Sequence, residues 1–168
     1  MRVIKRKNEF IPYKLINNNY VNIMWDYQPI KKTNAKGSQI ETPLGTWEEH
    51  LFDHIPDFLE IKKIIIDYYN NITNNEILSG LTWNGLLVWL SNENQFNYKS
   101  IYDLTIQNNG KNLPVSFKLG DDEKPIYYKF KNIDELKDFY FSCINHIQKK
   151  IQEGWEKKEQ INWNFYKK

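Results

Sequence analysis

Two histidines four residues apart are the strongest candidates for chemistry in this chain. His50 and His54 would share one face of a helix, and three acidic residues stand beside them. Histidine and carboxylate side chains at this spacing can ligate zinc or iron. No third ligand can be assigned, however, and the segment from Trp47 to Ile55 fits neither a helical nor a strand period. We therefore expect a polar surface segment here and no metal cofactor.

The other potentially reactive side chains have structural explanations. Asp121, Asp122 and Glu123 are contiguous, whereas a calcium loop spaces its ligands over about twelve residues, so these acids indicate a hairpin turn. The single cysteine, Cys143, falls on an apolar helical stripe, which excludes a disulfide framework and argues against a thiol nucleophile. No serine has an assignable histidine partner, and His146 borders the same stripe. The glycines are isolated, so there is no phosphate-binding loop. We expect a protein that is not an enzyme.

Basic residues could track a phosphate backbone, with nearby aromatic rings stacking on bases. The adjacent pairs are Lys31-Lys32, Lys62-Lys63, Lys149-Lys150, Lys157-Lys158 and Lys167-Lys168, and Arg2, Lys5, Arg6 and Lys7 lie near the start. Acidic residues are interleaved with them, as in Glu153, Glu156 and Glu159, and the net charge is only +2. This pattern favours a solvated surface over a nucleic-acid interface.

Length and hydropathy set the class of protein. A chain of 168 residues can bury a core without a metal or disulfide. No apolar run approaches the ~18 residues needed to cross a bilayer, and the charges in MRVIKRKNEF do not fit a signal peptide. We expect a soluble protein, made in the cytoplasm, with no membrane partner.

Residues 81–154 are predicted to contain one structural unit twice, a β-hairpin followed by a capped helix. In the first unit, Asn84-Gly85 is the turn, since both residues tolerate positive φ. Ser91 or Asn92 caps the helix, which ends before Gly110. In the second unit, strands flank the turn at residues 120–123. A helix then begins after Asn132 and ends at Gly154.

The fold class predicted is α+β, with repeated β-hairpin–α-helix units (a ββαββα core) preceded by a helix and an N-terminal β-rich arm. The preceding helix begins after Asp57, in a capping box with Glu60, and frays or breaks from Asn70 to Asn75. Two or three short strands, broken at Asn17-Asn18-Asn19, precede a linker from Pro29 to Gly45. The predicted domains are residues 1–45 (arm and linker), 46–154 (core) and 155–168 (aromatic tail).

Aromatic side chains outside the hairpin and helix units are the candidate interface residues. Tryptophan and tyrosine are enriched where interfaces bury their anchors. The candidates are Trp25, Tyr27, Trp47, Trp155, Trp163, Phe165 and Tyr166.

Several stretches resemble a family of small proteins encoded among the structural genes of tailed bacteriophages of gut anaerobes, including crAss-like phages. They are NGLLVWLSNENQFNYKSIYDLTIQNNGKNLPVSFKLG, YYKFKNIDELKDFY and GWEKKEQINW, with KRKNEF and GTWEEHLF nearer the N-terminus. The family has no agreed catalytic residues to transfer. The resemblance implies a virion component, either a head- or tail-fibre protein or an adaptor that docks fibres on the capsid or tail. This chain lacks a long collagen-like or coiled-coil repeat, which favours a connector over a fibre shaft.

We therefore expect a non-enzymatic virion structural protein that contacts other phage capsid, tail or fibre proteins. Components of particles usually meet at a symmetry axis, so a homo-oligomer, dimer or trimer, is expected. The alternative is a small phage protein that binds nucleic acid or a host factor.

Overall fold

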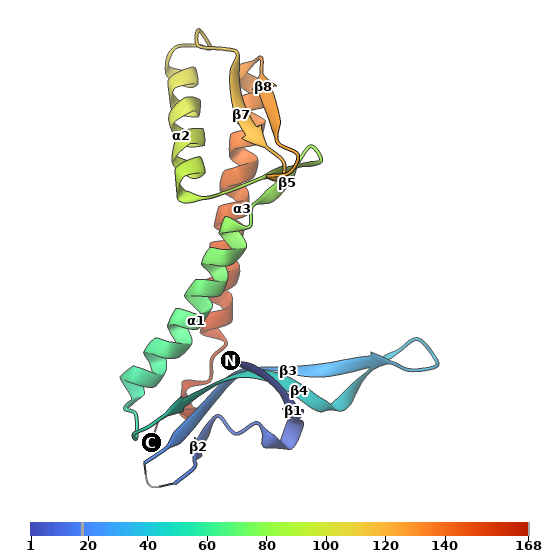
Figure 1. Cartoon of the computed structure of the whole chain (residues 1–168), viewed down its shortest axis with the longest axis vertical. Helices are drawn as coiled ribbons and strands as arrows, with labels where there is room; N and C mark the ends of the chain where they lie inside the picture. Colours follow the sequence, from blue (N-terminus) through green and yellow to red (C-terminus); the bar gives the residue numbers. More distant parts are fainter. Residues whose placement is uncertain (18, 168) are drawn as a thin grey trace. The chain divides into compact units, whose positions relative to one another are not determined.

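The computed structural model describes residues 1–17 and 19–167 and shows an α+β protein, as predicted (Figure 1). The chain divides into two compact units, one of Met1–Asp67 with Ile161–Lys168 and one of Tyr68–Gln160. This division differs from the predicted domains. Residue 45 lies inside a strand and residue 154 inside a helix, so neither position is a boundary.

The first unit is built on an antiparallel sheet of four strands in the order β1-β4-β3-β2. Val21, Ile23 and Trp25 are buried on one face of β3, because successive side chains of a strand point to opposite faces, and Met24 is buried on the other face. Asn18, within the predicted break between strands, lies outside the described residues. The elements are β1 (Arg2–Arg6), η1 (Lys7–Glu9), β2 (Tyr13–Leu15), β3 (Val21–Thr33) and β4 (Gln39–Phe52), with η2 (Trp163–Phe165) near the C-terminus.

The predicted linker from Pro29 to Gly45 is wrong. The strands β3 and β4 occupy most of this segment, and residues 34–38 make the turn between them. In the register of the two strands, Lys31 lies opposite Glu41, Lys32 opposite Ile40 and Thr33 opposite Gln39. Lysine, threonine and proline are frequent in loops, but exposed edge strands carry lysine and proline as well, so composition could not separate the two cases.

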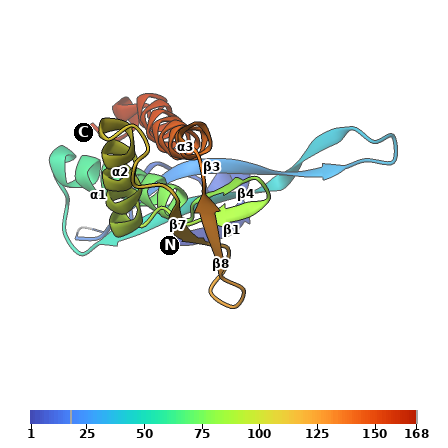
Figure 2. The ribbon, with the colours of Figure 1, turned by 90° about the horizontal axis from the view of Figure 1, so that it is seen from above.

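The outer end of this hairpin is a two-stranded ribbon of residues 28–44. From here on, the arm means this ribbon only, not the whole N-terminal segment predicted above. The strand β1 pairs with β4 only between Leu44 and Glu48, and β2 pairs with β3 only between Val21 and Ile23. Among the described residues, no third strand therefore flanks the paired residues nearest the turn. The arm extends beyond the rest of its sheet in Figures 1 and 2.

The helix α1 (Phe58–Leu78) begins where the sequence predicts. The backbone N–H of Glu60 donates to Asp57 Oδ1 at 2.9 Å, and that of Asp57 donates to Glu60 Oε2 at 2.8 Å, which confirms the capping box. The predicted fraying from Asn70 to Asn75 is wrong. Part of this segment packs against a helix distant in sequence, and such contacts override weak local propensity.

The second unit begins with the hairpin of β5 (Leu81–Trp83) and β6 (Leu86–Val88). Its turn residues Asn84 and Gly85 have φ of 47° and 77°, which confirms the predicted turn. The helix α2 (Asn92–Gln107) follows, and Ser91 Oγ accepts from the backbone N–H of Asn94 at 3.2 Å. After the helix, Asn109 and Gly110 adopt positive φ and end it as predicted.

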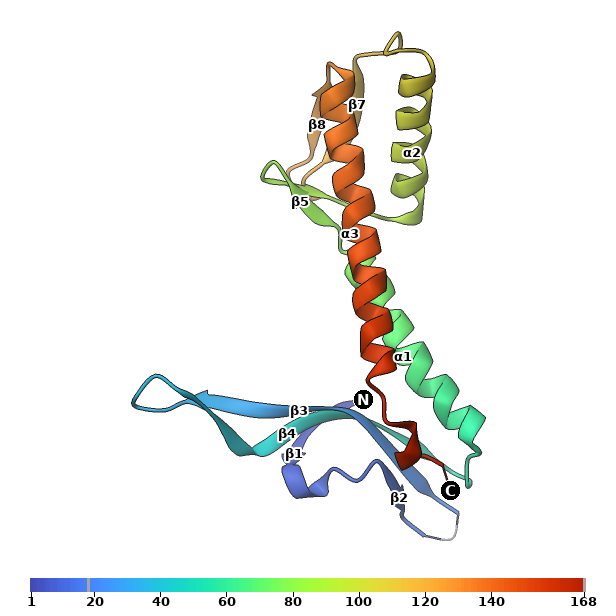
Figure 3. The ribbon, with the colours of Figure 1, turned by 180° about the vertical axis from the view of Figure 1, so that it is seen from behind.

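A second hairpin, β7 (Val115–Leu119) with β8 (Ile126–Phe130), leads into α3 (Ile133–Glu159). In Figures 1 and 3, α2 and this hairpin lie beside the first part of α3. Asn132 Oδ1 accepts from the backbone N–H of Glu135 at 2.8 Å and caps α3 as predicted. The two hairpins remain separate two-stranded sheets, and the helices that follow them have 16 and 27 residues.

The predicted end of α3 at Gly154 is wrong, since the helix continues to Glu159. Gly154 is buried, and a Cβ atom built there would lie 2.2 Å from Thr73 Oγ1 of α1. The glycine therefore permits a close approach of α1 and α3 and does not terminate the helix. A glycine can either end a helix or permit the close approach of a neighbouring element, and only the tertiary structure shows which applies.

Candidate functional site

His50 and His54, whose spacing was considered above as a possible metal pair, do not lie on a helix. His50 lies in β4 and His54 follows the end of that strand, so the two imidazoles do not share a helical face. His54 contacts Asp53 at 3.0 Å and Glu60 at 3.2 Å, and these hydrogen bonds, led by that of Asp53, raise its pKa. Across residues 1–17 and 19–167 no group of three or more histidine, cysteine or acidic side chains could hold a metal ion.

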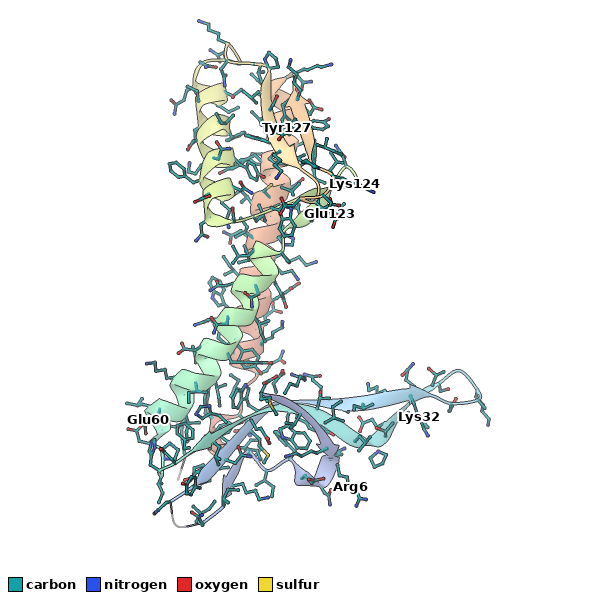
Figure 4. The ribbon with its side chains drawn as sticks, viewed as in Figure 1. Arg6, Lys32, Glu60, Glu123, Lys124 and Tyr127 are labelled. Atoms are coloured by element: carbon teal, nitrogen blue, oxygen red, sulfur yellow. The ribbon has the colours of Figure 1, made fainter. Side chains whose placement is uncertain are left out.

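The acidic turn and the cysteine have the structural roles that were predicted. Asp121 Oδ1 accepts from the backbone N–H of Lys124 at 2.6 Å, and Lys118 pairs with Asp122 at 3.0 Å, so these acids organise and flank the turn between β7 and β8. Figure 4 shows Glu123 and Lys124 at this turn. Burial raises the pKa of the Cys143 thiol to about 12, which keeps it protonated at neutral pH.

Four of the predicted interface residues belong to the interior of the first unit. Trp25, Trp47 and Tyr166 are buried, and Tyr27 is half-buried with its ring 6.4 Å from that of Trp47. The Tyr166 hydroxyl donates to the Met24 carbonyl at 2.8 Å, and burial raises its pKa to about 12. While this unit is folded, none of these residues can act as the main anchor of an external partner.

The remaining three predicted residues are more accessible and are divided between the two units. Trp163 is half-buried, with its ring edge-on to Phe58 at 6.0 Å. Phe165, in the first unit, and Trp155, in the second, are 57% and 58% exposed. Trp155 belongs to α3, not to a terminal tail.

The structure adds an apolar surface that the sequence did not reveal. Phe96 on α2 is 74% exposed and lines a cavity of about 200 Å³ between α2 and α3. Apolar side chains of α3, including Tyr140, Ile144 and Ile147, form the other wall. The residue was missed because Phe96 precedes the periodic apolar positions of its helix, so no pattern distinguished it from a core residue. Exposed aromatic groups beside apolar cavities are typical of protein interfaces.

The arm is a second candidate surface, with a different chemistry. It contains three lysines, Lys31, Lys32 and Lys36, and one acid, Glu41. Lys7 of η1 pairs with Glu41 at 3.3 Å, whereas the three arm lysines are exposed and make no ion pair within the described part of the chain. The arm therefore presents uncompensated positive charge.

Comparison of the chain with protein-family models, with curated proteins and with solved structures gives no significant match. No described helix is long and apolar enough to cross a membrane.

Proposed function

We propose that this chain is a non-enzymatic structural protein of a bacteriophage particle, a head- or tail-fibre component or an adaptor that docks fibres, and that it acts as a homo-oligomer. The particle role is supported by the resemblance of its hairpin and helix segments to proteins encoded among phage structural genes. The homo-oligomer is supported by the apolar surface around Phe96.

The observation that carries self-association is that Phe96 stands beside a cavity of its own unit. At 74% exposure the ring projects from α2, and the cavity of about 200 Å³ is walled by apolar side chains. The apolar surface thus has both a projecting ring and a cavity. In a two-fold dimer the apolar surfaces of the two copies contact each other, so each Phe96 can enter the cavity of the other copy.

We also propose that residues 81–159 form a repeated ββαββα body. The element order β5-β6-α2-β7-β8-α3 supports the repeat. A single cluster of buried side chains includes Trp83 and Tyr98 from the first half and Phe117 and Phe139 from the second. Because the two halves share one buried core, this body would be rigid enough to keep Phe96 and the cavity at fixed positions relative to each other.

The first test is the oligomeric state of the full chain measured by light scattering. We expect a dimer whose dissociation constant rises by about 10²- to 10⁴-fold in Phe96→Ala, since the dimer loses two buried phenylalanines and each contributes ~1.5–3 kcal/mol. Leu104→Ala is the matched control, because Leu104 is also exposed on α2 and does not line the cavity. A monomeric wild-type protein at its highest soluble concentration would contradict self-association.

The second test is the presence of the protein on purified phage particles, by mass spectrometry and antibody labelling in electron micrographs. We expect a fixed copy number per particle. A protein abundant in infected cells and missing from purified particles would refute the virion role, whatever its oligomeric state.

A further inference from the structure

We infer that the arm binds the phosphate backbone of double-stranded DNA through its lysine side chains, without reading the base sequence. This inference does not depend on self-association through Phe96 or on the virion role. Figure 4 shows Lys32 on the extended part of the β3–β4 hairpin, apart from Arg6 at the end of β1.

The fold separates the arm lysines from the other lysine pairs of the sequence. On α3, Lys149 and Lys150 pair with Glu153, and Lys157 pairs with Glu76. Two other lysines lie over aromatic rings: Lys62 of α1 is 5.8 Å from the centre of the Trp163 ring, and Lys167 is 5.7 Å from that of Phe58. Lys168 is outside the described residues. The arm lysines have neither kind of partner among the described residues, and uncompensated cations attract phosphates.

The backbone of the arm is poorly suited to recruiting a protein strand. Strand addition requires a row of free main-chain donors, and Pro29 and Pro43 each lack an N–H group. Lysine and proline on an exposed edge oppose pairing with another strand. Recognition by the arm must therefore come from its side chains.

The shape of the arm fits a groove of duplex DNA. Paired strands lie about 4.8 Å apart, and the major groove of B-DNA, about 12 Å wide, admits a two-stranded ribbon. Residues 28–44 contain no aromatic side chain. The arm thus offers no stacking platform for the unpaired bases of a single strand. These features favour a duplex over single-stranded nucleic acid.

The polar side chains of the arm are engaged within the arm or at its base. Gln39 Nε2 donates to Thr33 Oγ1 at 2.9 Å, and Asn34 Oδ1 accepts from the backbone N–H groups of Lys36 and Ser38. Gln28 Nε2 donates to Asp26 Oδ1 at 3.2 Å. Bidentate readout of a base edge by an amide uses both its oxygen and its nitrogen, and one of the two is engaged in each of these amides. The lysines remain as the available charged groups, and as flexible point charges they can contact phosphates of any sequence.

The test measures binding of the full chain to a labelled DNA duplex of about two helical turns by fluorescence anisotropy. Neutralising about three phosphates predicts a slope near −2.7 in a plot of log K against log salt, or about a 40-fold loss of affinity between about 50 and 200 mM salt. A duplex of different sequence should bind within about twofold. The variant K31A/K32A/K36A should lose most of the affinity and nearly all of the salt dependence.

Two variants control this experiment. K111A/K124A/K129A removes three exposed lysines from the second unit and should leave binding unchanged. K31R/K32R/K36R keeps the charge and should retain the affinity. Equal losses in the two alanine variants, or tighter binding of single-stranded DNA or of poly-L-glutamate than of the duplex, would overturn the inference. So would the absence of duplex binding at low salt, which would leave the lysines with only the role of protecting a strand edge.

Discussion

The lysines of α3 and those of the arm look alike in the sequence and have different surroundings in the folded protein. Lys150 and Lys157 are seven residues apart on α3, and each contacts Glu76 of α1 at 3.3 Å. Lys31 and Lys32 of the arm make no ion pair within the described residues. The element packed beside a lysine therefore decides its role. The helix α1 supplies an acid to α3, whereas the one acid of the arm, Glu41, pairs with Lys7.

The close packing of α1 and α3 has a specific cause. Gly154 leaves room for Thr73, and nearby Lys158 donates to Asn70 Oδ1 at 2.8 Å. Any Cβ at position 154 would displace Thr73 and move the helices apart. The ion pairs to Glu76 depend on the same approach, so one glycine supports both the packing and the neutralisation of the α3 lysines.

The largest effect is expected from breaking this packing with Gly154→Val. The new side chain would overlap Thr73, and overpacking of this kind costs about 1–3 kcal/mol. Urea unfolding of the full chain measures the change. Gln152→Val is the matched control, because Gln152 is exposed on the same helix, and it should change stability by less than about 1 kcal/mol. Equal effects of the two variants would contradict a packing role for Gly154.

A smaller effect is expected from Glu76→Gln, which removes the acid shared by Lys150 and Lys157. Partly exposed ion pairs contribute up to about 1 kcal/mol to the free energy of unfolding. The loss of stability in the variant should be smaller at about 1 M salt, where charges are screened within about 3 Å. The matched arm variant is Lys31→Gln with Lys32→Gln, whose free energy of unfolding should stay within about 0.5 kcal/mol of that of the wild type. A larger loss in the arm variant would show that its lysines have a structural role.

The smallest effect concerns pH. The hydrogen bond from Lys150, at 2.9 Å, lowers the pKa of Glu153 below its ordinary value of 4.5. A carboxyl group with a lowered folded-state pKa stabilises the protein above its unfolded-state pKa, and this stabilisation is lost as pH falls through the folded-state value. The difference in melting temperature between wild type and Glu153→Gln should therefore be larger near pH 7 than near about pH 3. A difference that does not change with pH would contradict the assignment.

Elements fixed by neighbouring residues could be predicted from the sequence. The turn at Asn84-Gly85 and the helix caps at Asp57 and Asn132 depend on residues within a few positions of each other, and the structure confirms them. The buried position of Cys143 followed from helical periodicity. In each case the physical cause is contained in one short segment.

The errors share a different origin. Residues 29–45 have the composition of a loop and form strands because each strand pairs with the other. Residues 70–75 are weak helix formers and stay helical where α1 packs on α3. The aromatic candidates were placed on a surface because nothing in the sequence showed that Trp25, Trp47 and Tyr166 are buried.

The sequence by itself determined the α+β class, the turns of the hairpins β5–β6 and β7–β8, the helix starts and the balance of charge, since these depend on residue type and short-range spacing. The tertiary structure decided that Gly154 is a packing residue, that Phe96 projects beside a cavity, and that three arm lysines make no ion pair within the described residues. These properties depend on which distant segments pack together. Burial and charge pairing between such segments have no local signature in the sequence.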